Sequence, residues 1–338
     1  MAQQDRPSPL PVPSPTSSFT PTPTPSPSNP QAPFPKPTVI PPRGPHTHTL
    51  ILLHGRGDSS LDFSTDIVTT PLTILSNPSL STTLPQRFPG VKFIFPSAKI
   101  GRSTAAGNTM MPQWFDIAAL NPPYHRQEEL QREGLRSSVN YLMDLVREEG
   151  KALGGVGKVV IGGLSQGAVV ALATALSFDA GGGGGGEPLG GCVAMSGWLA
   201  FQKELMALAG GKLGEDEDAA AVVVDQEDHE EEFQQRNPKI AVKAANWFRE
   251  NILNIPPLVA ADSQTPLSLP KTPLWIAHGA MDGHVKPQYG EEAAKTMERL
   301  GWNVTFMLYD DLGHWYMPDE LEDMAIYLNV MVGFPEAD

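Results

Sequence analysis

The chain carries six short apolar runs, each ended by a glycine, a proline or a charged residue. They cover residues 48–55, 91–96, 157–163, 191–197, 272–279 and 303–310. Within each run, apolar residues follow one another without the alternation of a strand that has one face in water. A short continuous run bounded by turn residues is typical of a buried β-strand. The pattern therefore predicts six strands that are buried on both faces of a sheet.

Helical periodicity fills the segments between these runs. In residues 127–149, starting at Leu135, apolar positions recur at steps of four, three and four. Residues 166–177 are apolar on nearly all sides, which predicts a buried helix. Further amphipathic or mixed helical patterns cover residues 238–253, 288–300 and 319–332. Because strands and helices alternate, we expect an α/β fold with a mostly parallel central sheet and helices on both faces.

Three segments lie outside this alternation. Sixteen of the 34 prolines precede residue 46, and such a composition cannot bury enough apolar surface to fold, so we predict a disordered N-terminal arm over 1–45. Six consecutive glycines predict a flexible insertion over 179–189. A stretch rich in Gly, Ala and acidic residues predicts a second, disordered insertion over 210–235. A single domain over 46–335 remains as the folded unit.

The formal net charge of −14 reflects a local run more than the whole surface. Ten acidic residues and no Lys or Arg lie between Glu215 and Glu232. The chain lacks the clustered basic residues that bind nucleic-acid phosphates, which excludes that class of partner. No apolar run reaches the about 20 residues that span a bilayer, and prolines stand where a signal peptide would be apolar. We therefore expect a soluble, cytoplasmic protein without stable membrane insertion.

The cysteine and histidine positions predict neither a disulfide nor a cofactor. Cys192 is the one cysteine, so an internal disulfide is excluded, and its apolar surroundings predict a buried strand thiol. The eight histidines show no metal-ligand spacing, and no glycine-rich phosphate-binding loop is present. We expect no metal and no cofactor.

The sharpest chemical signal is the pentapeptide Gly163-Leu164-Ser165-Gln166-Gly167. This G-x-S-x-G motif directly follows a predicted strand and directly precedes the predicted buried helix. That context is typical of a nucleophile elbow, a strained turn that lifts the serine Oγ above the sheet edge. Glycines are needed on both sides of the serine because a side chain there would collide with the neighbouring strand or helix. The motif therefore predicts Ser165 as a nucleophile.

A nucleophilic serine needs a base and an acid that orients the base. Asp282 and His314 lie just past the fifth and sixth predicted strands, at the sheet edge where Ser165 emerges. Loops that leave neighbouring parallel strands at one edge can bring their side chains into hydrogen-bonding reach. The order Ser, Asp, His is also that of an elbow-type hydrolase. We predict Asp282 as the acid and His314 as the base.

Other polar residues of the same loops have more ordinary interpretations. His278 is expected to end its strand as a packed residue, and His284 to lie on the rim, because it is too near Asp282 in sequence to act independently. Asp310 and Asp311 precede His314 by a few residues and are expected to shape its turn.

Two backbone N–H groups are candidate donors to an oxyanion. One is the N–H of Gln166, which follows the nucleophile at a helix N-terminus. The other lies in the loop after the first strand, where two glycines flank Arg56 and allow a close approach of the backbone. His54 and Asp58 in that loop are expected to brace it through hydrogen bonds.

Taken together, these motifs resemble the phospholipase/carboxylesterase family of α/β-hydrolases, whose best-known members are acyl-protein thioesterases. The matching pieces are, in order, LILLHGRGD, FIFPSAKIGRST, MPQWFDI, VVIGGLSQGAVVALATAL, MSGWL, WIAHGAMDGHV and LGHWY. The pattern is most similar to the fungal branch. The resemblance implies the α/β-hydrolase fold, with Ser165 as nucleophile, His314 as base, Asp282 as orienting acid, and Arg56 and Gln166 as backbone oxyanion donors.

The residues and the resemblance together predict a serine hydrolase that cleaves carboxylic esters or thioesters through an acyl-enzyme. Carboxylesterase, acyl-protein thioesterase and lysophospholipase activities all fit, so the substrate is a small acyl ester or an S-acylated protein. The alternative is a catalytically idle hydrolase fold that acts as a binding protein. In that case the proline-rich arm would recruit an SH3-type or WW-type domain.

Overall fold

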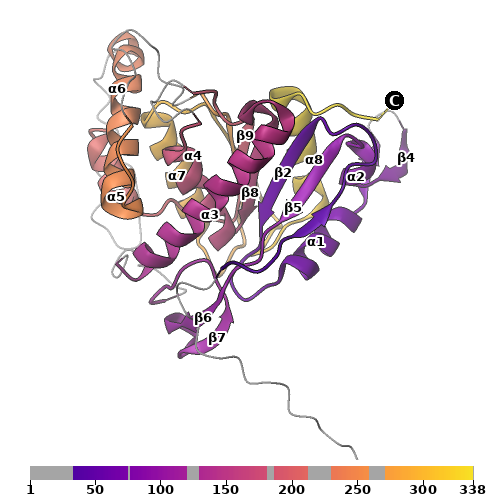
Figure 1. The fold of residues 1–338 in the computed structure, drawn as a ribbon, viewed down its shortest axis with the longest axis horizontal. Coiled ribbons are helices and arrows are strands. Elements are labelled where there is room, and N and C mark those ends of the chain that lie inside the picture. Colours follow the sequence, from indigo (N-terminus) through magenta and orange to yellow (C-terminus); the bar gives the residue numbers. More distant parts are fainter. Residues whose placement is uncertain are drawn as a thin grey trace, which may run out of the picture.

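A seven-stranded sheet lies at the centre of the protein (Figure 1). The computed structural model describes residues 33–74, 77–119, 129–180, 186–211, 230–258 and 271–337. The strand order is β1-β5-β2-β8-β9-β10-β11, with β1 antiparallel to β5 and all other neighbours parallel. The strands are β1 (Thr38–Ile40), β2 (His48–Leu53), β5 (Val91–Phe95), β8 (Val159–Leu164), β9 (Gly191–Met195), β10 (Leu274–Gly279) and β11 (Val304–Tyr309).

Helices cover both faces of this sheet. One face packs against α3 (Glu129–Leu153), α4 (Gln166–Ser177), α6 (Glu230–Phe248) and α7 (Pro287–Arg299), and the short α5 (Gln202–Leu208) lies on the same side. The other face packs against α1 (Ser60–Thr69), α2 (Leu84–Arg87) and α8 (Pro318–Tyr327). Short helical turns are η1 (Thr104–Ala106), η3 (Val156–Lys158), η4 (Arg249–Leu253) and η5 (Leu328–Val332).

Burial on both faces explains the continuous apolar runs of the sequence. In β2, Ile51 and Leu53 point into the core on the α4 side, whereas Leu50 and Leu52 point into the core on the α1 side. A strand with helices on both sides has no water-facing position, so its sequence does not alternate. The expected α/β-hydrolase architecture is thereby confirmed, with strands at all six predicted positions. The expectation of burial on both faces was wrong for β11, which lies at the edge of the sheet and has exposed residues such as Leu308.

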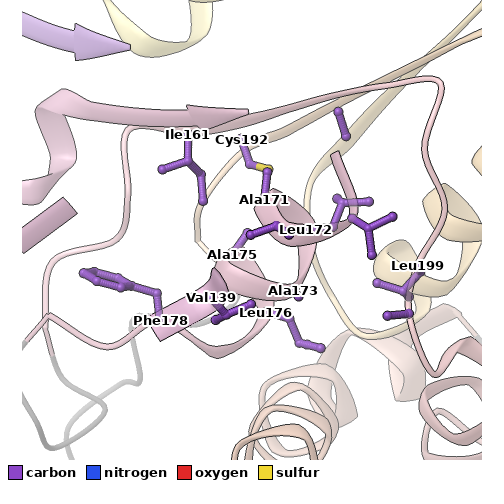
Figure 2. Packing of buried hydrophobic residues seen from close by; sticks show 14 of the residues in the cluster. Val139, Ile161, Ala171, Leu172, Ala173, Ala175, Leu176, Phe178, Cys192 and Leu199 are labelled. Atoms are coloured by element: carbon purple, nitrogen blue, oxygen red, sulfur yellow. The ribbon is translucent and has the colours of Figure 1, made fainter. Parts of the chain in front are cut away.

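Helix α4 is the most deeply enclosed helix among the described residues. Every one of its residues is buried. Figure 2 shows its side chains among those of Val139 from α3, Ile161 from β8 and Cys192 from β9. Its many alanines keep the helix close to the sheet. Cys192 is fully buried, as expected, and burial raises the pKa of its thiol far above the usual range.

The folded unit begins earlier than the sequence predicted. The boundary was expected between residues 45 and 46, but residues 38–40 form the edge strand β1, paired with β5. Just before it, the ring of Phe34 stacks on Tyr141 at a centroid distance of 4.1 Å. The prolines around β1 concealed the strand in the sequence, although proline is tolerated at a sheet edge. Residues 1–32 of the expected arm lie outside the described residues.

The two expected insertions also have ends that belong to the fold. Asp179 and Leu189, at the limits of the glycine-rich segment, are both buried. Helix α6 begins at Glu230 and therefore includes the last residues of the segment 210–235. Residues 181–185 and 212–229 lie outside the described residues.

Two small antiparallel hairpins were not expected from the sequence. They are β3 (Leu72–Ile74) with β4 (Asn77–Thr82), and β6 (Ile100–Ser103) with β7 (Thr109–Pro112). In Figure 1 the β6–β7 hairpin stands apart from the sheet, beyond the lower end of the labelled strands. Among the described residues, none of the helices combines the length and apolar character needed to cross a bilayer.

Candidate active site

Ser165 occupies a sharp turn between β8 and α4. Its backbone has φ 56° and ψ −120°, a conformation that non-glycine residues rarely adopt. The two flanking glycines permit this turn. A Cβ at Gly163 would lie 2.6 Å from the carbonyl oxygen of Leu53, and a Cβ at Gly167 would overlap the same Leu53 backbone. The steric reason for the G-x-S-x-G spacing is therefore confirmed.

The structure brings the three side chains singled out in the sequence into one hydrogen-bonded chain. Nε2 of His314 lies 3.0 Å from Oγ of Ser165, and Nδ1 of His314 lies 2.7 Å from Oδ2 of Asp282. Strands β10 and β11 are parallel neighbours, so the loops that follow them leave the sheet at the same edge. Ser165 and Asp282 are buried, and His314 is partly exposed.

The hydrogen-bond partners fix the proton positions. An ionised carboxylate only accepts hydrogen bonds, so Nδ1 of His314 carries the proton that is donated to Asp282. In the neutral imidazole, Nε2 is then unprotonated and accepts the hydroxyl proton of Ser165. The arrangement can take a proton from Ser165 while Asp282 stabilises the resulting imidazolium.

Asp282 is held in its ionised form. Burial alone would raise the pKa of its carboxyl, but hydrogen bonds from His278 and His314, together with the backbone N–H of Val285, hold the pKa well below its usual range. The other oxygen, Oδ1, accepts the backbone N–H groups of His284 at 2.8 Å and Val285 at 2.9 Å. Both oxygens of the carboxylate are thus fixed in direction.

The loop after β2 approaches the serine from the other side. A Cβ at Gly55 would lie 3.6 Å from the Cβ of Ser165, so this loop lies beside the serine. The guanidinium of Arg56 donates to Oγ of Ser103 at 2.8 Å and lies 3.6 Å from Sδ of Met111. These contacts tie the loop to the β6–β7 hairpin, a role that the sequence did not predict.

His54 braces this loop, as expected. Its Nδ1–H donates to the carbonyl of Gly55 at 2.7 Å, and its Nε2 accepts the N–H of Ala98 at 3.1 Å. Burial lowers the pKa of His54, and the Gly55 carbonyl opposes this only in part. The carboxylate of Asp58 accepts the backbone N–H of Ser59 at 2.7 Å.

The side chain of Gln166 also has a structural role. Its Oε1 accepts the N–H of Trp114 at 3.1 Å, and its Nε2 donates to the carbonyl of Phe115 at 2.9 Å. The indole Nε1–H of Trp114 donates to the carbonyl of His54 at 2.8 Å. Trp114 therefore links the start of α4 to the loop after β2. The sequence placed Gln166 next to the nucleophile but gave no signal for this link.

The remaining polar residues have the expected positions. His284 is exposed and its ring stacks on that of His314, with centroids 5.3 Å apart. Asp310 and Asp311 are exposed in the turn before His314. His278 is fully buried at the end of β10. Within the described ranges, no group of three or more His, Cys, Asp or Glu side chains is arranged to hold a metal ion.

The fold and the chain's relatives define the class of protein. The parallel sheet, the serine turn after β8 and the helices on both faces make this an α/β-hydrolase. The model of the phospholipase/carboxylesterase family matches residues 35–211, and the chain belongs to that family. The match begins at residue 35, two residues after the start of the described structure at residue 33.

Several relatives and solved structures are similar over most of the chain. An acyl-protein thioesterase 1 of Aspergillus fumigatus is 26% identical over 313 residues, covering 91% of this chain and 97% of the relative. An acyl-protein thioesterase 1 of Saccharomyces cerevisiae is 26% identical, covering 84% and 92%. Among solved structures, acyl-protein thioesterase 2 of Zea mays has a TM-score of 0.56 at 24% identity, covering 88% of this chain and 99% of that chain. The chain is accordingly a hydrolase that acts on esters or thioesters.

Proposed function

We propose that this protein is a serine hydrolase that cleaves acyl esters and thioesters through an acyl-enzyme formed on Ser165. The observation that carries the proposal is the pair of hydrogen bonds that connects Ser165 to Asp282 through His314. Nε2 of His314 lies 3.0 Å from Oγ of Ser165, and Nδ1 lies 2.7 Å from Oδ2 of Asp282. This geometry suits a serine that is deprotonated as it attacks a carbonyl carbon.

In the first half of the reaction, Oγ of Ser165 attacks the acyl carbon and His314 takes its proton. The tetrahedral oxyanion would be held by the backbone N–H groups of Arg56 and Gln166. The approach of Gly55 to Ser165 supports the Arg56 assignment, and the start of α4 at Gln166 supports the other. The imidazolium then gives its proton to the leaving alkoxide or thiolate.

In the second half, His314 activates a water molecule that attacks the acyl-enzyme. The carboxylic acid leaves and Ser165 recovers its proton. Asp282 remains ionised throughout, consistent with its lowered pKa. Each step therefore uses only the residues described above.

For the substrate, we propose S-acylated proteins together with smaller acyl esters. The names of the fungal relatives, acyl-protein thioesterases, support the first, and the family description supports the second. A cytoplasmic location, where such substrates would be met, remains a prediction.

A substrate series tests this proposal. We expect hydrolysis of an S-palmitoyl peptide and of p-nitrophenyl esters from acetate to palmitate by the full chain. We expect Ser165→Ala to lower kcat by at least about a thousandfold on every active substrate. Equal rates for the two proteins would contradict the proposal, and the preferred acyl chain would separate thioesterase from short-chain esterase activity.

The alternative of a catalytically idle binding protein is not favoured. An idle fold has no need of the strained serine turn or of the aligned His314 and Asp282. An SH3-type or WW-type partner for the proline-rich arm stays a prediction from the sequence, and residues 1–32 lie outside the described residues.

A further inference from the structure

Asp282 contacts a second imidazole besides that of His314. His278 lies at the end of β10 and is fully buried. Its Nε2 is 2.9 Å from the carbonyl oxygen of Val285 and 3.2 Å from Oδ2 of Asp282. Oδ2 is the same oxygen that accepts the Nδ1–H of His314. Two imidazoles therefore converge on one carboxylate oxygen.

The surroundings of His278 fix which nitrogen carries the proton. The Val285 carbonyl can only accept, so Nε2 is protonated and its N–H is shared between this carbonyl and Asp282. Nδ1 is buried and has no hydrogen-bond partner among the described residues. A second proton on Nδ1 would therefore be buried without an acceptor, which is costly. His278 is consequently a neutral donor through Nε2.

Helix α7 holds the His278 ring in place. Gly290, at the end of the first turn of α7, lies directly against the ring, and a Cβ at this position would overlap Nδ1. The absence of a side chain at Gly290 lets the helix pack on the imidazole. The ring thus has one orientation, with Nε2 toward the loop that carries Asp282.

We infer that His278 is a positioning residue for the proposed catalytic base, and that it acts through Oδ2 of Asp282. The inference rests on the proposed function. Oδ2 accepts N–H groups from His278 and His314, and Oδ1 accepts two backbone N–H groups, so the carboxylate is held from both sides. The His278 donor fixes where Oδ2 lies and draws off part of its negative charge. It thereby sets both the orientation of the His314 ring and the strength with which Asp282 attracts the Nδ1 proton of His314.

Three histidines lie at or next to the Asp282 carboxylate among the described residues. His278 and His314 contact Asp282 directly, and His284 stacks on His314 from the solvent side. Helix α7 contacts the His278 ring through Gly290, which has no charge, and carries the titratable residues Tyr289 and Glu292 near it. Removing the His278 donor therefore acts on Asp282 first and on His314 through it.

The first test compares His278→Gln with His278→Met. The glutamine amide can place an N–H near the position of Nε2, whereas the methionine side chain has similar bulk and no donor. We expect His278→Met to lower kcat by about tenfold or more with little change in KM, because a hydrogen bond to a charged group is lost. We also expect the acidic limb of the kcat/KM profile to move to higher pH, since an Asp282 with fewer donors holds the imidazolium more strongly. His278→Gln should restore most of both properties.

A second variant disturbs the ring without replacing it. Gly290→Ala would displace the His278 imidazole from its present position beside Asp282, because the added Cβ would overlap Nδ1. We expect a change in kcat and pH profile in the same direction as in His278→Met. The matched control is Gly44→Ala, where an added Cβ would be 3.8 Å from the carbonyl of Pro89, an ordinary contact. Gly290→Ala also decides the question if His278→Met does not fold.

A spectroscopic measurement separates this inference from the proposed function. The Nδ1 proton of His314, donated to Asp282, should give a far-downfield proton resonance. We expect that resonance to shift in His278→Met and to return toward its wild-type position in His278→Gln. Wild-type kcat and pH profiles in both His278→Met and Gly290→Ala would overturn the inference. Equal losses in the Met and Gln variants, without a moved profile or resonance, would also overturn it. If Ser165→Ala retains turnover, the proposed function fails, while the resonance still reports whether His278 acts on Asp282.

Discussion

Ser165 shows how one residue's backbone determines the site. A positive φ of 56° at a residue with a side chain is unfavourable, and the turn persists because β8 and α4 are both firmly packed around it. Gly163 and Gly167 provide the space that the turn requires. The strain and the two glycines together direct Oγ toward His314.

Replacing Gly167 by alanine should therefore damage both stability and activity. The new methyl group would overlap the backbone of Leu53, which is part of the central sheet and cannot move freely. We expect a loss of about 1–3 kcal/mol in the free energy of unfolding, measured by urea denaturation, and a lower kcat. Gly283→Ala, where a Cβ would meet nothing within 4 Å, is the control and should unfold like the wild type. Equal stabilities of the two variants would contradict the steric account.

At the scale of single residues, the sequence identified the three side chains of the hydrogen-bonded chain. It did not reveal the contacts that hold these side chains in place. Ser165, Asp282 and His314 could be predicted because each directly follows a strand in the same parallel sheet. His278 was interpreted as a packed residue, since the sequence does not reveal which nitrogen faces which acceptor. The orientation of the His278 ring depends on helix α7, because Gly290 of that helix packs against the ring. Gly290 is far in sequence from the G-x-S-x-G motif.

Helix α8 carries an unusual buried charge-bearing residue. Glu320 lies in its first turn with no exposed surface, and neither carboxylate oxygen has a hydrogen-bond partner among the described residues. Burial raises the pKa of Glu320 to about 8. In the folded state Glu320 is therefore protonated at neutral pH.

This proton makes stability depend on pH in a defined direction. The folded-state pKa, about 8, exceeds the ordinary value of 4.5, so the unfolded chain releases the proton first as the pH rises. The Glu320 contribution to stability is thus fully present below about pH 4.5 and is lost as the pH rises toward 8. We expect Glu320→Gln, which has no proton to lose, to raise the free energy of unfolding by a few kcal/mol, on the order of one for each pH unit of this window.

Urea unfolding near pH 5 and near pH 8 measures this effect. The difference in the free energy of unfolding between Glu320→Gln and wild type should be larger near pH 8 than near pH 5. Asp319→Asn, at the exposed neighbouring position, serves as the control and should show no such difference. If the two variants depend on pH in the same way, Glu320 is not the group responsible.

Among the elements, long periodic segments could be predicted and short ones could not. The buried helix α4 was predicted with the same bounds that the structure gives. Strand β1 and the β6–β7 hairpin have three or four residues per strand, too few to show a period. In addition, β1 is defined by its pairing with β5, and a partner so distant in sequence leaves no local pattern.

At the scale of the whole molecule, residues 33–40 fasten the N-terminal segment to the domain. Phe34 stacks on Tyr141 of α3, and Nζ of Lys99 lies 4.3 Å from the centre of the Phe34 ring. Strand β1 then extends the sheet beside β5. The proline content of this region concealed both contacts in the sequence.

Two truncations test where the domain begins. Deleting residues 1–32 should leave Tm and kcat unchanged, because the composition of that segment does not support a packed core. Deleting residues 1–41 removes Phe34 and β1 and should lower stability by about 1–3 kcal/mol, a shift that thermal unfolding can detect. A Tm that is identical for both truncations would place the domain boundary after β1.

The most direct test of the central claim is to locate the covalent adduct on the protein. We would treat the active full chain with a fluorophosphonate probe, which modifies activated serines, and identify the labelled peptide by mass spectrometry. The account predicts one adduct on Ser165, none on Ser165→Ala, and much slower labelling of His314→Ala, whose serine lacks its base. Hydrolytic activity without an adduct, or an adduct on another residue, would contradict the assignment of Ser165 as the nucleophile.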